Sequence, residues 1–122
     1  VAENVGLPLA VTGHSEKEKK SLAAQALDRV GLNGKARRLP DQLSGGEQER
    51  VAISRALVNN PPILFADEPT GNLDSVNSNR IMSLLKDLNA EGQTIVMVTH
   101  SRENAAFAHR VVEVRDGRVA AQ

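Results

Sequence analysis

The apolar residues of this chain follow two spacings, and each spacing predicts a different kind of element. Apolar residues at helical intervals predict helices over 15–30, about 47–59 and 75–90. Continuous apolar runs rich in branched side chains predict strands at Ile63–Ala66 and Thr94–Thr99, each buried on both faces of a parallel sheet. The order strand, helix, strand therefore predicts one βαβ unit with a right-handed crossover.

The first two predicted helices differ in how much of their surface is apolar. In the helix at 15–30 the apolar residues share one face, Ser15 is a suitable N-cap and Gly31 ends the helix. In the helix at 47–59 they cover a wide arc that includes Ala52 and Ala56. We therefore expect this second helix to be well buried.

The segments outside these elements are less regular. Residues 1–14 contain two glycines and a proline and predict an irregular lead-in. Residues 102–108 predict a short helix, and 111–115 with 118–121 predict a β-hairpin whose turn is Asp116-Gly117.

Composition excludes several functions. The 122 residues hold 15 Lys+Arg and 15 Asp+Glu, and this balance argues against binding nucleic acid or a lipid surface by bulk charge. No cysteine is present, which excludes disulfides and thiolate sites, and two phenylalanines are the only aromatic residues, which argues against a base-stacking platform. No apolar run approaches the ~20 residues that span a bilayer. We therefore expect a globular cytoplasmic chain.

The octet Leu43–Arg50, called here the signature turn, is the most specific pattern. Ser44 and Glu47 form an S-x-x-E capping box, which explains those two residues without any ligand. A capping box does not need two adjacent glycines. Glycines let a ligand approach the backbone closely, and the N–H groups at a helix N-terminus attract an anion. The candidate phosphate-binding residues are Ser44, Gly45, Gly46, Glu47 and Gln48.

A second group of candidates follows the two predicted strands. Asp67 and Glu68 end the first strand, and His100 follows the second. Because the strands are predicted to be parallel, these side chains are expected at one edge of the sheet, where open α/β sheets bind ligands. Taken singly, an acidic pair or a histidine at this place is often only solvent-exposed.

Together, in this order, the patterns resemble ATP-binding-cassette (ABC) ATPases: the signature motif, the Walker B strand and the switch histidine. The resemblance implies that Asp67 serves Mg²⁺ through water, that Glu68 polarises the attacking water and that His100 contacts the γ-phosphate of ATP. Asn72, Leu73 and Asp74 resemble the D-loop of the family, which reaches across a dimer interface, although Asp74 is also a plain N-cap.

The resemblance extends to fold and function. It implies an α/β fold with a partial P-loop NTPase-like parallel sheet, a helical signature subdomain at 1–60 and, at 61–122, the C-terminal part of a RecA-like core with its β-hairpin. It implies the ATP-hydrolysing subunit of a transporter at the cytoplasmic membrane face, with a transmembrane permease and a second, head-to-tail ATPase subunit as partners. Sequence details are most similar to the lipoprotein-release and macrolide-export group.

The phosphate-binding P-loop G-x-x-x-x-G-K-[ST] is absent from this sequence, since Gly34-Lys35 is followed by Ala36. We therefore expect the chain to represent the C-terminal half of such a domain, with little ATP hydrolysis on its own. In the family the P-loop strand pairs with the strand that ends before His100. The bare edge is expected to drive self-association or to be covered in a non-native way.

Two other functions remain open. A non-transport ATPase with the same cassette, in DNA repair or chromosome architecture, is disfavoured because no heptad run of a coiled coil is present. The segment Gly31–Gly34 with the basic residues after it imitates the GXXG loop of RNA-binding KH domains. Neutral net charge argues against that function, and a helix C-cap followed by a turn explains the segment equally.

Overall fold

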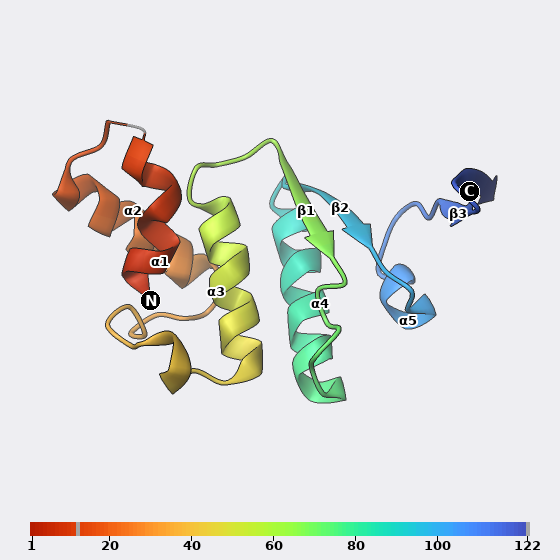
Figure 1. Ribbon diagram of the computed structural model, residues 1–122, viewed down its shortest axis with the longest axis horizontal. Helices are drawn as coiled ribbons and strands as arrows, with labels where there is room; N and C mark the ends of the chain where they lie inside the picture. The colour runs from red at the N-terminus through yellow and green to blue at the C-terminus, as the bar shows by residue number, and fades with distance from the viewer. Residues whose placement is uncertain (12, 122) are drawn as a thin grey trace.

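The structure, a computed structural model, describes residues 1–11 and 13–121. Its helices are α1 (Ala2–Gly6), α2 (Glu16–Arg29), α3 (Gly45–Leu57), α4 (Ser75–Ala90) and α5 (Arg102–Ala105), with 3₁₀ turns η1 (Leu7–Val11) and η2 (Pro40–Gln42). Its strands are β1 (Ile63–Asp67), β2 (Thr94–Val98), β3 (Glu113–Arg115) and β4 (Arg118–Ala121). Figure 1 shows the first three helices on one side of the molecule and β1, β2 and α4 on the other. From residue 15 onward, the predicted order of helices and strands is confirmed.

The expectation of an irregular lead-in at 1–14 is wrong for most of that segment, although position 12 lies outside the described residues. Residues 2–11 form α1 and η1 despite Gly6 and Pro8. Val5 is 0% and Leu9 1% exposed, so this segment buries its apolar side chains in the core. The backbone N–H of Ala2 also donates to the Ala36 carbonyl at 2.9 Å. Tertiary contacts stabilise a helix that is too short to form alone.

Two helices end in the same glycine-dependent way. After α2, Gly31 has a φ of 76°, the Gly31 N–H donates to the Asp28 carbonyl, and the Leu32 N–H donates to the Leu27 carbonyl at 2.9 Å. After α4, Gly92 has a φ of 110° and the Gln93 N–H donates to Leu88. Both are Schellman caps. The Gly31–Gly34 segment is thus accounted for by a helix cap and turn.

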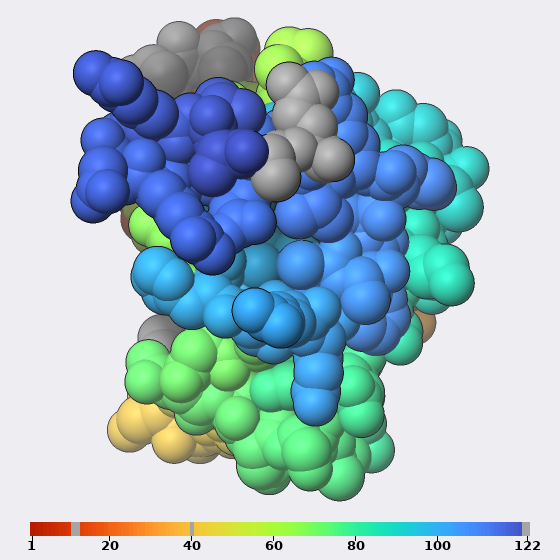
Figure 2. Space-filling model, turned by 90° about the vertical axis from the view of Figure 1, so that its right-hand side faces the viewer, coloured from red at the N-terminus to blue at the C-terminus, as the bar shows by residue number. Residues whose placement is uncertain are grey.

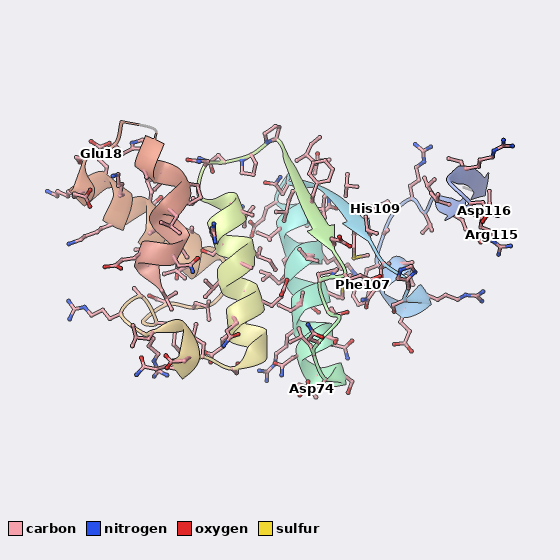
Figure 3. The ribbon with its side chains drawn as sticks, viewed as in Figure 1. Glu18, Asp74, Phe107, His109, Arg115 and Asp116 are labelled. Atoms are coloured by element: carbon pink, nitrogen blue, oxygen red, sulfur yellow. The ribbon has the colours of Figure 1, made fainter. Side chains whose placement is uncertain are left out.

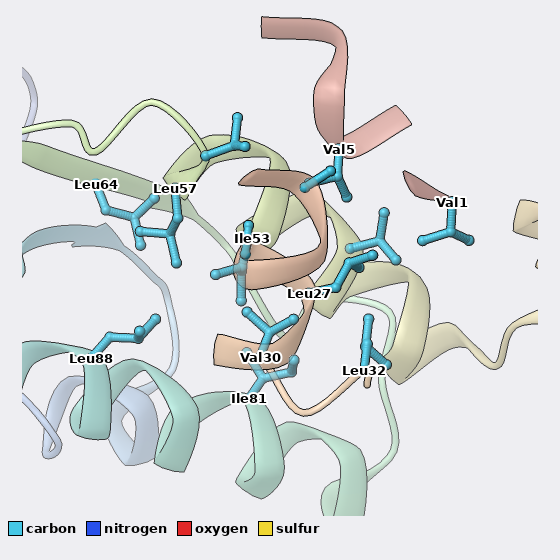
Figure 4. Packing of buried hydrophobic residues seen from close by; sticks show 14 of the residues in the cluster. Val1, Val5, Leu27, Val30, Leu32, Ile53, Leu57, Leu64, Ile81 and Leu88 are labelled. Atoms are coloured by element: carbon cyan, nitrogen blue, oxygen red, sulfur yellow. The ribbon is translucent and has the colours of Figure 1, made fainter. Parts of the chain in front are cut away.

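One hydrophobic core joins the two sides of the chain. Leu27 on α2, Ile53 and Leu57 on α3, Leu64 on β1 and Ile81 on α4 belong to one cluster, and Figure 4 shows them converging. The cluster is therefore continuous across position 60, so the two predicted parts of the chain share their apolar interior.

Helix α3 is less buried than its apolar pattern predicts. Ile53 and Leu57 are buried, but Ala52 and Ala56 are exposed and line a groove of about 730 Å³ that α1 and η2 also border. The expectation of burial over the whole arc is wrong for these two alanines, because no described element covers that side of α3.

The βαβ unit is confirmed, with β1 and β2 parallel and Phe65 paired with Val96. Leu64 is 4% exposed and faces the core, whereas the opposite side carries a bare sheet face made of Ile63, Phe65, Val96 and Val98. These four are 42%, 73%, 44% and 56% exposed. The expectation that both strand faces are buried is wrong here, because in the described part of the chain helices cover only one face and each strand pairs only with the other.

The C-terminal hairpin forms as predicted. Strands β3 and β4 are antiparallel, and Asp116 and Gly117 have φ angles of 52° and 74°, the left-handed pair that a tight hairpin turn requires. Seen from the right-hand side of Figure 1, the hairpin and α5 lie in front of the rest of the molecule (Figure 2). No helix among the described residues is long and apolar enough to cross a membrane.

Candidate functional site

The signature turn begins α3 with a complete capping box. The Ser44 hydroxyl accepts the Glu47 N–H at 3.2 Å, and Glu47 Oε1 accepts the Ser44 N–H at 3.1 Å. Glu47 Oε2 also lies 3.1 Å from Lys35 Nζ. The carboxylate of Glu47 is therefore engaged within the chain, and it fixes the shape of the turn.

The turn presents polar hydrogens at the positive end of a helix. Gly45 and Gly46 are the first two residues of α3, so their N–H groups have no acceptor within the helix. Gln48 donates its amide to the Leu43 carbonyl at 3.3 Å, which braces the other side of the turn. An exposed Ser44 and two glycine N–H groups at a helix N-terminus suit a phosphate oxygen.

The stability of the turn should depend on pH through Glu47. The Ser44 N–H and then the Lys35 ammonium lower the pKa of the Glu47 carboxyl below its ordinary 4.5. A carboxyl with a lowered folded-state pKa stabilises fully above 4.5, and this contribution is lost as pH falls through the folded value. Lys35→Met should lower the free energy of unfolding at pH 7 by about 0.2–1 kcal/mol, and the gap to the parent chain should narrow in acid.

Urea unfolding of this chain between pH 7 and 3 measures that gap. The matched control is Lys86→Met, because Lys86 is exposed on α4 without a described ion pair. If the difference in free energy of unfolding between Lys35→Met and the parent chain stays constant with pH, or equals that of Lys86→Met, the Lys35–Glu47 ion pair does not stabilise the turn.

The end of β1 holds the second group. Glu68 has a φ of 46°, a left-handed conformation that is costly for a residue with a side chain and recurs at functional sites. Its N–H donates to the Val98 carbonyl at 2.8 Å. Its carboxylate accepts the His100 N–H at 2.8 Å and the Thr99 hydroxyl at 3.5 Å. The strained backbone and these donors aim the carboxylate along the edge of the sheet.

His100 and Asp67 lie at the same edge. His100 Nε2 is 3.7 Å from Glu68 Oε1, and the ring is 97% exposed, so it is open to a ligand. Asp67 is exposed at the last position of β1, paired with Val98. In the described part of the chain no three acidic, histidine or cysteine side chains form a metal cluster. A single carboxylate fits Mg²⁺, which keeps several of its water ligands and takes others from phosphate oxygens.

The predicted D-loop lies beside the signature turn. Asp74 caps α4 by accepting the Asn77 N–H at 2.8 Å. The Leu73 side chain lies next to Gly45, since its Cδ2 would be 3.5 Å from a Cβ built on that glycine. Figure 3 labels Asp74 where α4 begins, and Figure 1 shows α3 starting at the same end of the molecule. Asn72 is exposed. The candidates thus form two groups: the signature turn with the D-loop, and Asp67, Glu68 and His100 at the sheet edge.

The sequence analysis did not identify two asparagines at this site. Asn104, 7% exposed, donates to the Thr70 hydroxyl at 2.7 Å and so ties α5 to the segment after Glu68. Asn77 lies between Asp74 and Gly46. Asn104 lies three residues after the N-cap Ser101, and Asn77 lies three residues after the N-cap Asp74. That spacing is a sequence signal for a helix start, but it does not indicate a contact with another element.

Two parallel strands with Asp67-Glu68 and His100 at one edge, together with a separate glycine-led helix N-terminus, are typical of part of a P-loop NTPase-like α/β fold. A family model described as "ABC transporter" matches residues 1–71. The chain belongs to the ABC transporter family.

Three curated relatives are similar over nearly the whole chain. The lipoprotein-releasing system ATP-binding protein LolD of Aquifex aeolicus is 52% identical over 96% of this chain and 52% of its own length. The macrolide export ATP-binding/permease protein MacB of Chlorobium luteolum is 55% identical over 98% of this chain and 18% of its own. The cell division ATP-binding protein FtsE of Streptococcus pneumoniae is 48% identical over 98% of this chain and 52% of its own length.

A solved structure shares the fold. The dimeric cassette MJ0796, described as a bacterial ABC transporter cassette, has a TM-score of 0.81 and 47% identity over 98% of this chain and 54% of its own. The same cassette in a post-hydrolysis state, bound to ADP and Pi, has a TM-score of 0.80. The chain spans about half the length of LolD, FtsE and MJ0796.

Proposed function

We propose that this chain carries the signature motif, the D-loop and the catalytic carboxylate of an ATP-hydrolysing subunit of an ABC transporter. The observation that carries the proposal is the Glu68 carboxylate, held in a left-handed backbone and bonded to the His100 N–H at 2.8 Å. A carboxylate fixed at the carboxyl end of a parallel strand is placed to act on a bound nucleotide. The family and the post-hydrolysis MJ0796 structure support nucleotide hydrolysis.

In this proposal Glu68 orients and deprotonates the water that attacks the γ-phosphate, and one of its carboxylate oxygens takes the proton. The exposed His100 ring donates a hydrogen bond to a γ-phosphate oxygen, and Asp67 is the residue that would hold Mg²⁺, through a water molecule. Bound Mg²⁺ supplies positive charge to the phosphates. Catalysis then arises from position and charge rather than from a covalent intermediate.

The signature turn acts on a nucleotide held by a second subunit. Ser44 and Gly45 are exposed at the start of α3, where the N–H groups of Gly45 and Gly46 have no acceptor within the helix, and Gln48 and Glu47 brace the turn. The MJ0796 cassette is described as dimeric, which supports a head-to-tail pair in which Asn72, Leu73 and Asp74 line the same interface.

The names of the relatives support a proposed location and a remaining partner. LolD, MacB and MJ0796 are named as parts of transport systems, so we place the complete protein at the cytoplasmic membrane face, docked on a transmembrane permease that selects the cargo. FtsE is named for cell division, which supports a second candidate, an ABC ATPase with a non-transport role. A permease that co-purifies favours the first, and a division complex the second.

The test is ATP turnover by the complete natural polypeptide that carries this sequence. We expect phosphate release that needs Mg²⁺ and rises with the square of protein concentration while the subunits are mostly separate, because each site needs two copies. Turnover that is linear in protein at every concentration contradicts the shared site. Absence of turnover with bound ATP contradicts the proposed function.

A further inference from the structure

The second glycine of the signature turn lies against a side chain of another helix. A Cβ built on Gly46 would be 2.6 Å from Asn77 Oδ1 and 2.9 Å from Asn77 Cγ, closer than Cβ atoms come to other heavy atoms. The first glycine is less constrained, since a Cβ on Gly45 would meet Leu73 Cδ2 at 3.5 Å, an ordinary contact. Gly46 is also buried. The absence of a side chain at Gly46 is therefore what lets the amide of Asn77 reach the backbone of the turn.

The D-loop holds the same amide from the other side. Asn77 Nδ2 donates to Asp74 Oδ2 at 3.3 Å, while the Asn77 backbone N–H donates to Asp74 Oδ1 at 2.8 Å. The backbone bond alone completes the cap of α4, and any residue except proline supplies it. The side-chain bond and the contact with Gly46 are additional to the cap, so they need another explanation.

We propose that Asn77 is a positioning residue that holds the signature turn and the D-loop of one subunit in fixed relation, so that both meet the second subunit together. The inference rests on the proposed function. The two segments belong to different helices, α3 and α4, and each must be placed to within a fraction of an ångström to act at a shared site. One amide wedged between Asp74 and Gly46 couples them through direct contact, the kind of link that transmits position between sites.

The first experiment compares Asn77→Ala with Asn79→Ala in the complete natural polypeptide. Asn79 is exposed on the same helix, so its variant removes the same atoms without touching the signature turn. For Asn77→Ala we expect about tenfold weaker ATP-driven association of two subunits, measured with Glu68→Gln present to stop turnover, and about tenfold lower kcat without it. ATP binding to a separate subunit should not change, and Asn79→Ala should stay within about twofold in every measurement.

Asn77→Asp tests the chemistry of the link. It keeps the size of the side chain but places a second carboxylate beside Asp74 in place of the amide donor. We expect an association at least as weak as that of Asn77→Ala. Association equal to that of the parent protein would mean that the amide donor is irrelevant, and it overturns the proposed link to Asp74.

A double variant tests the contact with Gly46 directly. Gly46→Ala should weaken association by about tenfold or more, since its Cβ would overlap the amide. Adding Asn77→Ala removes Oδ1 and Cγ and leaves only the Asn77 Cβ, 3.3 Å away, so the double variant should associate at least as well as Gly46→Ala alone. If the double variant instead shows the product of the two single-variant losses in association, the proposal is overturned.

Failure of this inference is separable from failure of the proposed function. If the parent protein hydrolyses ATP and Asn77→Ala behaves as Asn79→Ala does, the positioning role is wrong and the proposed function stands. If the parent protein binds ATP but shows no turnover, the proposed function is wrong and the positioning role falls with it.

Discussion

Glu68→Gln should lower kcat for ATP hydrolysis by about 10²- to 10⁴-fold in the complete polypeptide, because an amide does not accept the proton of the attacking water. The loop should keep its shape, since the Gln Oε1 still accepts the His100 N–H that Glu68 accepts at 2.8 Å. ATP binding should therefore persist, and the ATP-bound pair of subunits should accumulate. Phosphate release and size-exclusion chromatography with ATP measure the two effects.

The matched control is Glu103→Gln. Glu103 is an exposed carboxylate on α5, close along the chain to His100, and its variant changes the charge by the same amount. We expect its kcat to stay within about twofold of the parent value. If Glu68→Gln also keeps its turnover within that range, Glu68 is not the base. If it loses ATP binding in parallel with turnover, the residue is structural.

The 122-residue chain by itself should self-associate through the bare sheet face. Phe65, 73% exposed, lies beside Val96 in the parallel register, so the two present continuous apolar surface next to unpaired strand edges. Phe65→Ser should weaken self-association about 30-fold, as expected for loss of a central aromatic contact worth about 2 kcal/mol. Sedimentation equilibrium of the purified chain measures the constant.

A pair of valine variants tests whether this face, rather than apolar surface in general, is responsible. Val96→Thr lies on the bare sheet face, whereas Val76→Thr makes the same change at a 60% exposed position on α4. Only Val96→Thr should weaken the association. Equal effects of the two variants, or a monomeric parent chain at every concentration, contradict a specific interface on the sheet.

Much of the candidate site could be predicted because its residues are close in sequence to the elements that hold them. The signature turn is set by the Ser44–Glu47 capping box, and the capping bond observed at 3.2 Å needs only the spacing S-x-x-E. Asp67 ends a strand and Glu68 follows it, and parallel pairing places His100 at the same edge. These are local or one-step inferences, so sequence periodicity is enough to support them.

Burial could not be predicted in the same way. An apolar strand such as Ile63–Ala66 has the same pattern whether one or both faces are covered, because the pattern records what each side chain favours and not what lies opposite it. Leu64 is buried because helices cover its face of the sheet, and Phe65 is exposed because no described element covers the other face. Residues 2–11 show the opposite case, since this segment lacks a clear helical pattern but forms α1 and η1 with Val5 and Leu9 buried in the core.

The sequence by itself determined the order of the elements, their caps and the class of chemistry, because helix and strand periods, N-caps and glycine turns act over a few residues. Apart from the pairing of the two strands, only the tertiary structure decided which side chains of different elements touch. It placed Asn104 on Thr70, 34 residues away, and Asn77 against Gly46. Contacts of this kind depend on how α3, α4 and α5 pack together. Residues that are far apart in the sequence but fit together in the fold produce no periodic pattern from which the contact could be predicted.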